Sequence, residues 1–127
     1  MVVDFTNLQL DDKSPIYMQI VRYVKICIVA GQIKTEDELP SRRILSAMLE
    51  VNPNTIQKAY RMLEMEGLIV SFAGSKSIFQ LEEWQRVEIQ KQLLKEETVH
   101  FVEMMKQMGI TLEEVQQFIS QMWKGEM

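Results

Sequence analysis

The stretch that decides the fold spans residues 39–67 and reads LPSRRILSAMLEVNPNTIQKAYRMLEMEG. Ser41 is a candidate N-cap for a short helix, because its hydroxyl can accept a hydrogen bond from the first free backbone N–H groups. Asn52 can cap a second helix in the same way, with Pro53 at the first helical position, where no N–H is needed. Gly67 supplies the stop of the second helix. The stretch therefore predicts two short helices joined by a tight turn.

The second of these helices has two faces of opposite character. Its apolar residues recur at spacings of three and four, which places them on one face: Ile56, Ala59, Tyr60 and Leu63. Its outer face carries Asn52, Asn54, Thr55, Gln57, Lys58 and Arg61. Amides can pair with adenine, and Lys or Arg can meet guanine or phosphate. A solvated helix surface is the alternative, but amides replace the usual mixture of Glu and Lys, so the pattern favours DNA contact.

The start of the first helix is basic. Ser41, Arg42 and Arg43 open this helix, and its free backbone N–H groups suit a phosphate of the DNA backbone. We therefore expect these three residues to contact DNA together with the outer face of the second helix.

The flanking sequence completes a known arrangement. Ser14 and Pro15 mark the start of an earlier helix that ends at Gly31, and residues 31–39 are expected to be a connection. Residues 1–14 are expected to be extended, with Phe5 and Leu8 anchored on the body. The runs 68–72 and 77–81 are β-prone and flank a turn, which predicts a hairpin. Helix, helix, recognition helix and hairpin in this order form a winged helix-turn-helix.

These residues resemble the DNA-binding domain of GntR-family bacterial transcription regulators. The resemblance covers about residues 14–80 and rests on two separated motifs, Leu39-Pro40-Ser41-x-Arg43-x-Leu45 and Val51-Asn52-Pro53-Asn54-Thr55, followed by Ala59-Tyr60, Leu63-Glu64 and Glu66-Gly67-Leu68. It implies that Arg43 contacts DNA, as do Asn52, Asn54, Thr55 and Gln57. It also implies that Gly74, at the tip of the wing, approaches the minor groove.

The wing departs from the family pattern. Phe72 and Ala73 stand where basic residues are usual, and Lys76 stands where a second Gly is expected. Lys58 replaces an Arg that is common in the family, and Arg42 is an additional cation. We therefore expect DNA binding to depend on the helices more than on the wing. In the wing, Lys76 is expected to contact a backbone phosphate rather than the minor groove.

The C-terminal segment predicts two further helices. A long helix from residue 82 to residue 108 is interrupted at Gly109, and Thr111 with Glu114 forms a capping box for a last helix. We assign residues 1–81 to the DNA-binding domain and residues 82–127 to a two-helix dimerisation region. A lone pair of helices cannot bury its large apolar side chains, so we expect a homodimer held by Trp84, Phe101, Met105, Phe118, Met122 and Trp123.

In its short C-terminal segment the chain resembles the YtrA-like subfamily. In that subfamily two C-terminal helices serve dimerisation, and the genes commonly neighbour those of ABC transporters. A two-fold dimer places two recognition helices about one DNA turn apart, which implies a palindromic operator in double-stranded DNA. The resemblance thus implies a transcriptional regulator, with repression by occupancy of a promoter the simplest mode. No small-molecule effector can be identified from the residues, and a lipophilic ligand among the methionines is a minor alternative to a packing seam.

Charge and composition exclude several other classes. Residues 13–76 hold nine Lys/Arg and six Asp/Glu, whereas residues 77–127 hold five Lys/Arg and nine Asp/Glu, so a net positive charge is confined to the predicted DNA-binding segment. No apolar run of about 18 residues or signal peptide is present, which predicts a cytoplasmic protein without a membrane span. The single cysteine, Cys27, lies in an apolar helical run and is expected to be a buried structural thiol.

Enzymatic chemistry has little support in the sequence. His100 is the only histidine and is expected to be solvated or at an interface, and no Gly-rich phosphate-binding motif occurs. One Cys and one His cannot form a zinc site within one chain, so no metal or cofactor is expected. The alternative function is a winged-helix module that binds proteins without specific DNA binding, and only a DNA binder is expected to lose affinity steeply with salt.

Overall fold

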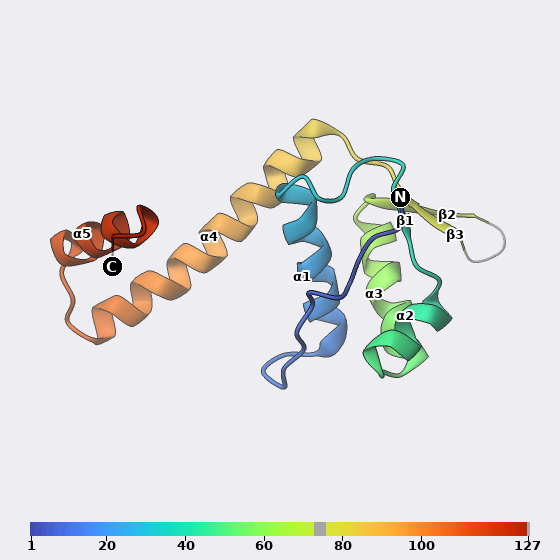
Figure 1. The fold of residues 1–127 in the computed structure, drawn as a ribbon, viewed down its shortest axis with the longest axis horizontal. Helices are drawn as coiled ribbons and strands as arrows, with labels where there is room; N and C mark the ends of the chain where they lie inside the picture. Colours follow the sequence, from blue (N-terminus) through green and yellow to red (C-terminus); the bar gives the residue numbers. More distant parts are fainter. Residues whose placement is uncertain (73–75, 127) are drawn as a thin grey trace. The chain divides into compact units, whose positions relative to one another are not determined.

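The computed structural model describes residues 1–72 and 76–126 and contains a mainly helical chain with a small sheet (Figure 1). In chain order the elements are α1 (Ile16–Val29), β1 (Glu38–Leu39), α2 (Arg42–Leu49), α3 (Pro53–Met65), β2 (Ile69–Phe72), β3 (Lys76–Phe79), α4 (Glu83–Gln107) and α5 (Leu112–Trp123). Contacts divide the chain into two compact units, Met1–Gln90 and Lys91–Met127. The predicted fold class, a winged helix-turn-helix followed by two helices, is confirmed.

Helix α1 begins one residue later than the sequence indicates. Pro15 has a ψ of 138° and stands at the N-cap position, and its carbonyl accepts hydrogen bonds from the N–H groups of Met18 and Gln19. The predicted apolar face is buried, with Ile20, Val24 and Ile28 at most 2% exposed. The chain leaves the helix through Gly31, whose φ of 78° is a left-handed conformation that glycine adopts without strain.

Both helices of the predicted helix-turn-helix are capped as expected. The Ser41 hydroxyl accepts a hydrogen bond from the N–H of Ile44 at 3.1 Å, and Asn52 Oδ1 accepts one from the N–H of Asn54 at 2.8 Å. Pro53 occupies the first position of α3. Each cap of this kind contributes about 1 kcal/mol of helix stability, so the sequence fixes where both helices begin.

The turn between α2 and α3 is held by one strained residue and one buried hydroxyl. Glu50 adopts a left-handed conformation with a φ of 57°, which is uncommon for a residue with a side chain. Ser46 donates a hydrogen bond from its hydroxyl to the carbonyl of Val51 at 2.6 Å and is itself buried. The turn thus has a fixed geometry, which sets the direction of α3.

The inner face of α3 forms the centre of the core. Ile56, Ala59, Tyr60 and Leu63 are at most 1% exposed, as the spacing predicts, and α3 packs against α1, α2 and β2. The Tyr60 hydroxyl donates to the carbonyl of Pro40 at 2.7 Å, and burial raises the pKa of this hydroxyl above its ordinary value. Four buried side chains on one helix face fix the rotation of α3 about its axis.

The sheet contains one strand more than the sequence predicts. Strands β2 and β3 form the predicted hairpin, with Ile69 opposite Phe79, and β1 adds to the other edge of β3 in the order β1-β3-β2. The prediction that residues 31–39 form only a connection is therefore wrong. A strand of two residues is too short for an alternating pattern, and it exists because β3 offers it a free edge.

The N-terminal segment packs on the rest of the first unit. Val2 pairs with Glu38 in a parallel bridge, and Phe5 is 1% exposed, so its predicted anchoring is confirmed, whereas Leu8 is only half-buried. The Tyr23 hydroxyl donates to the carbonyl of Asp4 at 2.9 Å, and burial raises the pKa of Tyr23 to about 12. The segment thereby extends the sheet edge beside β1.

The C-terminal unit contains most of α4 and all of α5. Gly109 separates the helices with a φ of 72°. The predicted capping box is present: Thr111 Oγ1 accepts from the N–H of Glu114, and the Glu114 carboxylate accepts from the N–H of Thr111. None of the residues of α5, all of which are described, is buried.

Candidate nucleic-acid interface

The outer face of α3 presents a polar stripe to solvent. Asn54, Lys58 and Arg61 are exposed and lie at spacings of four and three, so they form one row along the helix opposite the buried face. Thr55 and Gln57 are half-buried and flank this row. We call Asn54, Lys58 and Arg61 the recognition row. Because the opposite face of α3 is locked in the core, the recognition row is held on a rigid element.

Asn52 has a structural role that limits what it can read. Its Oδ1 accepts the N–H of Asn54, which uses the amide oxygen as the helix cap. Bidentate recognition of adenine requires both the oxygen and the nitrogen of an amide. For Asn52 such recognition competes with the cap, whereas its amide NH₂ group can donate without disturbing α3.

The two arginines at the start of α2 have different environments. Arg43 is exposed and forms no ion pair with any residue that the structure describes. Arg42 is half-buried, with its guanidinium carbon 5.2 Å from the centroid of the Tyr60 ring and its Nε buried without a hydrogen-bond partner among the described residues. Arg42 is therefore tied to the core, and Arg43 is the cation that can move to meet a phosphate.

Ser41 is occupied as a cap but keeps one hydrogen-bonding function. Its oxygen accepts from the N–H of Ile44, while its own O–H can still donate to a phosphate oxygen. Ser41 and Arg43 thus present a hydroxyl and a guanidinium at the same helix start.

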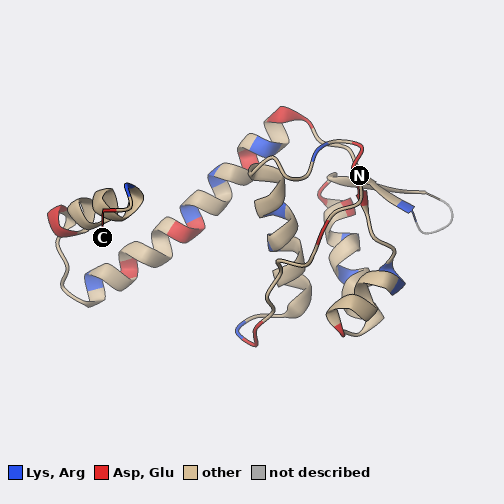
Figure 2. Cartoon of the chain, viewed as in Figure 1, with Lys and Arg blue, Asp and Glu red and all other residues tan. Residues whose placement is uncertain are grey.

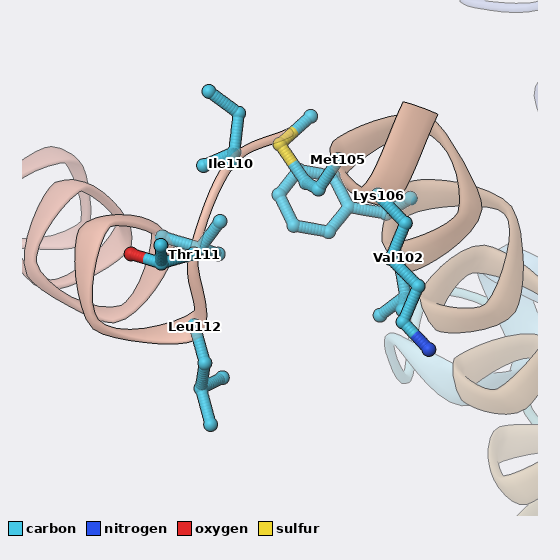
Figure 3. Close-up of a pocket in the computed structure, with 8 residues that line it drawn as sticks. Val102, Met105, Lys106, Ile110, Thr111 and Leu112 are labelled. Atoms are coloured by element: carbon cyan, nitrogen blue, oxygen red, sulfur yellow. The ribbon is translucent and has the colours of Figure 1, made fainter. Parts of the chain in front are cut away.

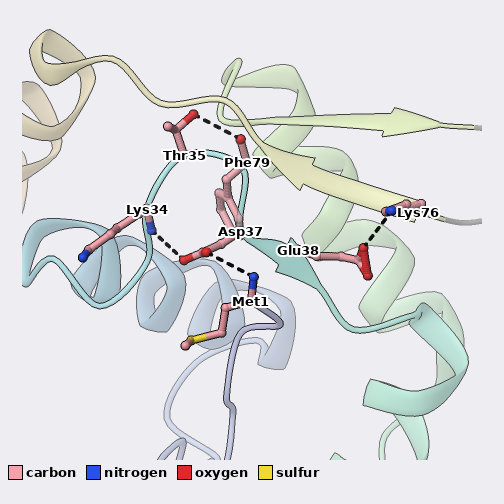
Figure 4. A network of polar contacts seen from close by, with 7 residues as sticks. All are labelled: Met1, Lys34, Thr35, Asp37, Glu38, Lys76 and Phe79. Carbon is pink, nitrogen blue, oxygen red and sulfur yellow. Dashed lines mark hydrogen bonds and ion pairs between the residues drawn. The ribbon is translucent and has the colours of Figure 1, made fainter.

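The described part of the wing offers one cation, and this cation is paired. Lys76 Nζ lies 3.4 Å from a carboxylate oxygen of Glu38 on β1 (Figure 4). An exposed pair of this kind is worth at most about 1 kcal/mol, but it must be broken or shared when Lys76 approaches a phosphate. Gly74, the predicted tip residue, lies outside the described residues.

Charge is unevenly distributed along the elements. Figure 2 shows Lys and Arg on α2 and α3, whereas Lys or Arg and Asp or Glu alternate along α4. Within the first unit, the basic residues of α2 and α3 include the exposed side chains of Arg43, Lys58 and Arg61. This concentration of positive charge on the two helices suits a polyanionic surface.

Tyr17 is a further neighbour of the recognition row, and the DNA-binding pattern of the sequence does not include it. The Lys58 ammonium nitrogen lies 4.1 Å from the centroid of its ring. Tyr17 precedes Ile20 and Val21 by about one helical turn, so it shares the inner face of α1 that packs on α3. This periodicity was the available signal, and it places Tyr17 beside the second helix.

The residues expected at a dimer interface fall in different surroundings. Phe101, Met105, Phe118 and Met122 line a groove of about 450 Å³ between α4 and α5, together with other apolar side chains. Trp123 is 88% exposed and lies outside this groove, and Trp84, in the first unit, donates its Nε1–H to a Glu82 carboxylate oxygen at 2.6 Å.

A second hollow of the C-terminal unit lies where α4 turns into α5. Figure 3 shows Val102 and Met105 of α4 on one side of it, with Thr111 and Leu112 on the other. The walls of both hollows are almost entirely hydrocarbon, so the described C-terminal unit exposes a continuous apolar surface.

The side chains that could act in catalysis or metal binding do not lie together in the described part of the chain. Cys27 is buried, and burial raises the pKa of its thiol, while His100 is exposed on α4. Across residues 1–72 and 76–126, no group of three or more His, Cys, Asp or Glu side chains is arranged to hold a metal ion. Within the same residues, no helix combines the length and the apolarity that a membrane span requires.

Comparison with known proteins agrees with this geometry. The model of the family "Bacterial regulatory proteins, gntR family" matches residues 16–79, which run from α1 to the end of the wing. The HTH-type transcriptional repressor YtrA of Bacillus subtilis is 33% identical over 117 residues, which cover 90% of either chain.

Solved structures extend the likeness to the fold. A GntR family transcriptional regulator from Listeria monocytogenes is 34% identical with a TM-score of 0.77, over 88% of this chain and 98% of that one. The DNA-binding domain of AraR in complex with operator ORX1 is 25% identical with a TM-score of 0.50, over 63% of this chain and 95% of that one. The chain therefore belongs to the gntR family of bacterial regulatory proteins, and it is a DNA-binding transcription regulator of the YtrA-like type, not an enzyme.

Proposed function

We propose that this regulator is a cytoplasmic repressor that binds a palindromic operator as a homodimer. The observation that carries the proposal is the recognition row, which exposes an amide and two cations on a helix whose opposite face is locked in the core. Such a helix can enter the major groove without losing its packing. The likeness to the operator-bound AraR domain and to the repressor YtrA supports DNA binding and repression.

The homodimer is supported by the apolar surface of the C-terminal unit. Phe118 and Met122 are 53% and 61% exposed, although they lie on the apolar face of α5. An isolated helix pair leaves this apolar surface in contact with water, whereas in a two-fold dimer each copy covers the apolar surface of the other. A two-fold partner also pairs the recognition helices, which is why the operator is proposed to be a palindrome.

The contacts with DNA are proposed to differ in weight. Arg43 and the recognition row are proposed to contribute most of the binding free energy, because their side chains are exposed. Lys58 is in addition held over the Tyr17 ring. Ser41, Arg42, Asn52, Thr55 and Gln57 support them from half-buried or capping positions. Lys76 contributes least, since Glu38 already neutralises it.

The test begins with selection of bound sequences from random DNA by the full-length protein. We expect a two-fold symmetric site with half-sites about one helical turn apart. Gel-shift titration on this site should show that Arg43→Ala nearly abolishes binding, whereas Lys76→Ala lowers the affinity only slightly. Equal losses in the two variants would show that the ranking is wrong, and recovery of no preferred sequence would show that the proposed operator binding is wrong.

The regulated genes are proposed from the resemblance to YtrA-like regulators. We expect the selected site to occur upstream of an operon that encodes an ABC transporter and includes this regulator. A reporter driven by that promoter should rise when the regulator is deleted. A fall in the reporter would identify an activator instead.

A further inference from the structure

The contact between Lys58 and Tyr17 joins the recognition row to another helix. The Lys58 ammonium nitrogen lies 4.1 Å from the centroid of the Tyr17 ring, well within the distance of about 6 Å at which a ring face attracts a cation. Lys58 is the middle member of the recognition row, between Asn54 and Arg61. A contact that restricts the Lys58 side chain therefore acts at the centre of the surface proposed to bind DNA.

Tyr17 occupies an edge between the core and this surface. It lies on the face of α1 that carries Ile20, Val21 and Val24, but these residues are at most 6% exposed while Tyr17 is only half-buried. The packing of α1 on α3 holds the backbone that carries this ring, and the Lys58 ammonium lies over the ring. A rigid aromatic ring held in this way is a suitable platform for a flexible ammonium.

The lysine needs such a platform because of its own freedom and its neighbours. A free lysine side chain populates many rotamers, and fixing one of them on DNA binding costs conformational entropy. Arg61 lies three residues further along the same helix face, so the two like charges repel each other. The negative face of the Tyr17 ring offsets this repulsion and limits the rotamers before DNA arrives.

We propose that Tyr17 is a positioning residue for operator binding, whose ring holds the Lys58 ammonium ready to meet a backbone phosphate. The inference rests on the proposed DNA contact of Lys58 and assigns the pre-ordering of that contact to a residue of α1. The ring is the active part, because the Tyr17 hydroxyl forms no hydrogen bond with any residue that the structure describes.

The experiment is a double-mutant cycle on the selected operator with Tyr17→Leu, Lys58→Ala and the double variant. Tyr17→Leu should lower the affinity about two- to fivefold, which is the size of an exposed cation–π contact. In the Lys58→Ala background the same change should have no further effect. Tyr17→Phe is the matched control and should bind like the wild type, since it keeps the ring and loses only the hydroxyl.

The salt dependence of binding tests whether Lys58 contacts a phosphate, because a purely structural role of Lys58 would leave this dependence unchanged. Lys58→Ala should reduce the slope of log affinity against log salt by about 0.9, as expected for one lost phosphate contact. An unchanged slope would overturn the phosphate assignment. Equal losses in Tyr17→Phe and Tyr17→Leu, or additive losses in the cycle, would overturn the role of the ring.

The free protein provides a measurement that does not depend on folding of the variants. In the wild type, the ε-methylene protons of Lys58 should show an upfield ring-current shift in NMR spectra. A random-coil shift would overturn the proposal. If Arg43→Ala abolishes binding but Tyr17→Leu leaves it unchanged, only this inference fails; if no DNA sequence is selected, the proposed function itself fails.

Discussion

Helices α3 and α5 are nearly the same length and each has a side-chain N-cap, yet they differ completely in burial. Helix α3 has 13 residues with Asn52 as its cap, and α5 has 12 residues with a complete capping box. Helix α3 buries four side chains within its own unit, whereas α5 buries none. Local signals therefore determine that both helices form, and they do not determine what either helix packs against.

Because of this difference in burial, we expect the two helices to be stabilised in different ways. Helix α3 gains its stability inside one chain, which leaves its outer face free for polar residues that contribute nothing to packing. A helix of 12 residues with an uncovered apolar face is marginal in water by itself. We infer that α5 depends on a second copy of the chain, so its stability should depend on protein concentration.

The largest expected effect is on the α3 side of this comparison. Leu63→Ala removes a side chain that is 0% exposed, and it should lower the free energy of unfolding of the first unit by about 2–5 kcal/mol. Met65→Ala is the control, because Met65 is 79% exposed and its loss should cost no more than about 0.5 kcal/mol. Urea denaturation followed by circular dichroism measures both.

This loss should be the same at every protein concentration. If the effect of Leu63→Ala instead decreased as the protein concentration rose, α3 would also depend on the partner. The proposed separation between the two helices would then be wrong.

Most of the fold could be predicted because its signals are local. Caps at Ser41, Asn52 and Thr111 and the apolar spacing of α3 each depend on residues within a few positions of one another. Strand β1 could not be predicted, since its two residues pair with Ile78 and Ser77, which lie 40 and 38 positions further along the chain. A pairing of this range leaves no periodic pattern in the sequence.

The candidate site divides in the same way. The exposure of Asn54, Lys58 and Arg61 follows from helical periodicity and could be predicted. The difference between Arg42 and Arg43 could not, because it depends on the Tyr60 ring that lies beside Arg42 only after folding. The pairing of Lys76 with Glu38 likewise requires β1, so it could not be foreseen without that strand.

The next effect concerns the apolar face of α5. Phe118→Glu places a charge on the surface that we propose the second copy covers, and it should weaken the dimer at least about a hundredfold, because burying an unpaired charge costs several kcal/mol. Gln117→Glu is the matched control, since it adds the same charge to the opposite face of the same helix. Sedimentation equilibrium over a range of concentrations measures the dissociation constant.

The two variants should also differ in operator binding. Phe118→Glu should lose the affinity that comes from two linked half-sites, while the folding of its first unit stays intact. Equal dissociation constants for the two variants would mean that Phe118 is not at the interface. The apolar face of α5 would then need another partner.

The smallest effect is a pH dependence confined to the α5 cap. Hydrogen bonds from the N–H and the hydroxyl of Thr111 hold the pKa of the Glu114 carboxyl below its ordinary value of 4.5. Because the pKa is lowered in the folded state, the cap contributes its full stability above pH 4.5 and loses it as the pH falls through the lower folded value. Helix α3 has no titrating cap, since Asn52 is an amide, so acidification should weaken α5 alone through this mechanism.

Glu114→Gln separates this mechanism from general acid unfolding. Glutamine can still accept the N–H of Thr111 but does not titrate, so the variant should be slightly less stable near neutral pH and should lose the cap-specific pH dependence. The backbone amide shift of Thr111, whose N–H donates to the Glu114 carboxylate, should titrate between pH 6 and pH 3 in the wild type and change much less in the variant, as NMR can measure. If both proteins titrate alike, the capping box is not formed in solution, and α5 must be ordered by its partner rather than by its own sequence.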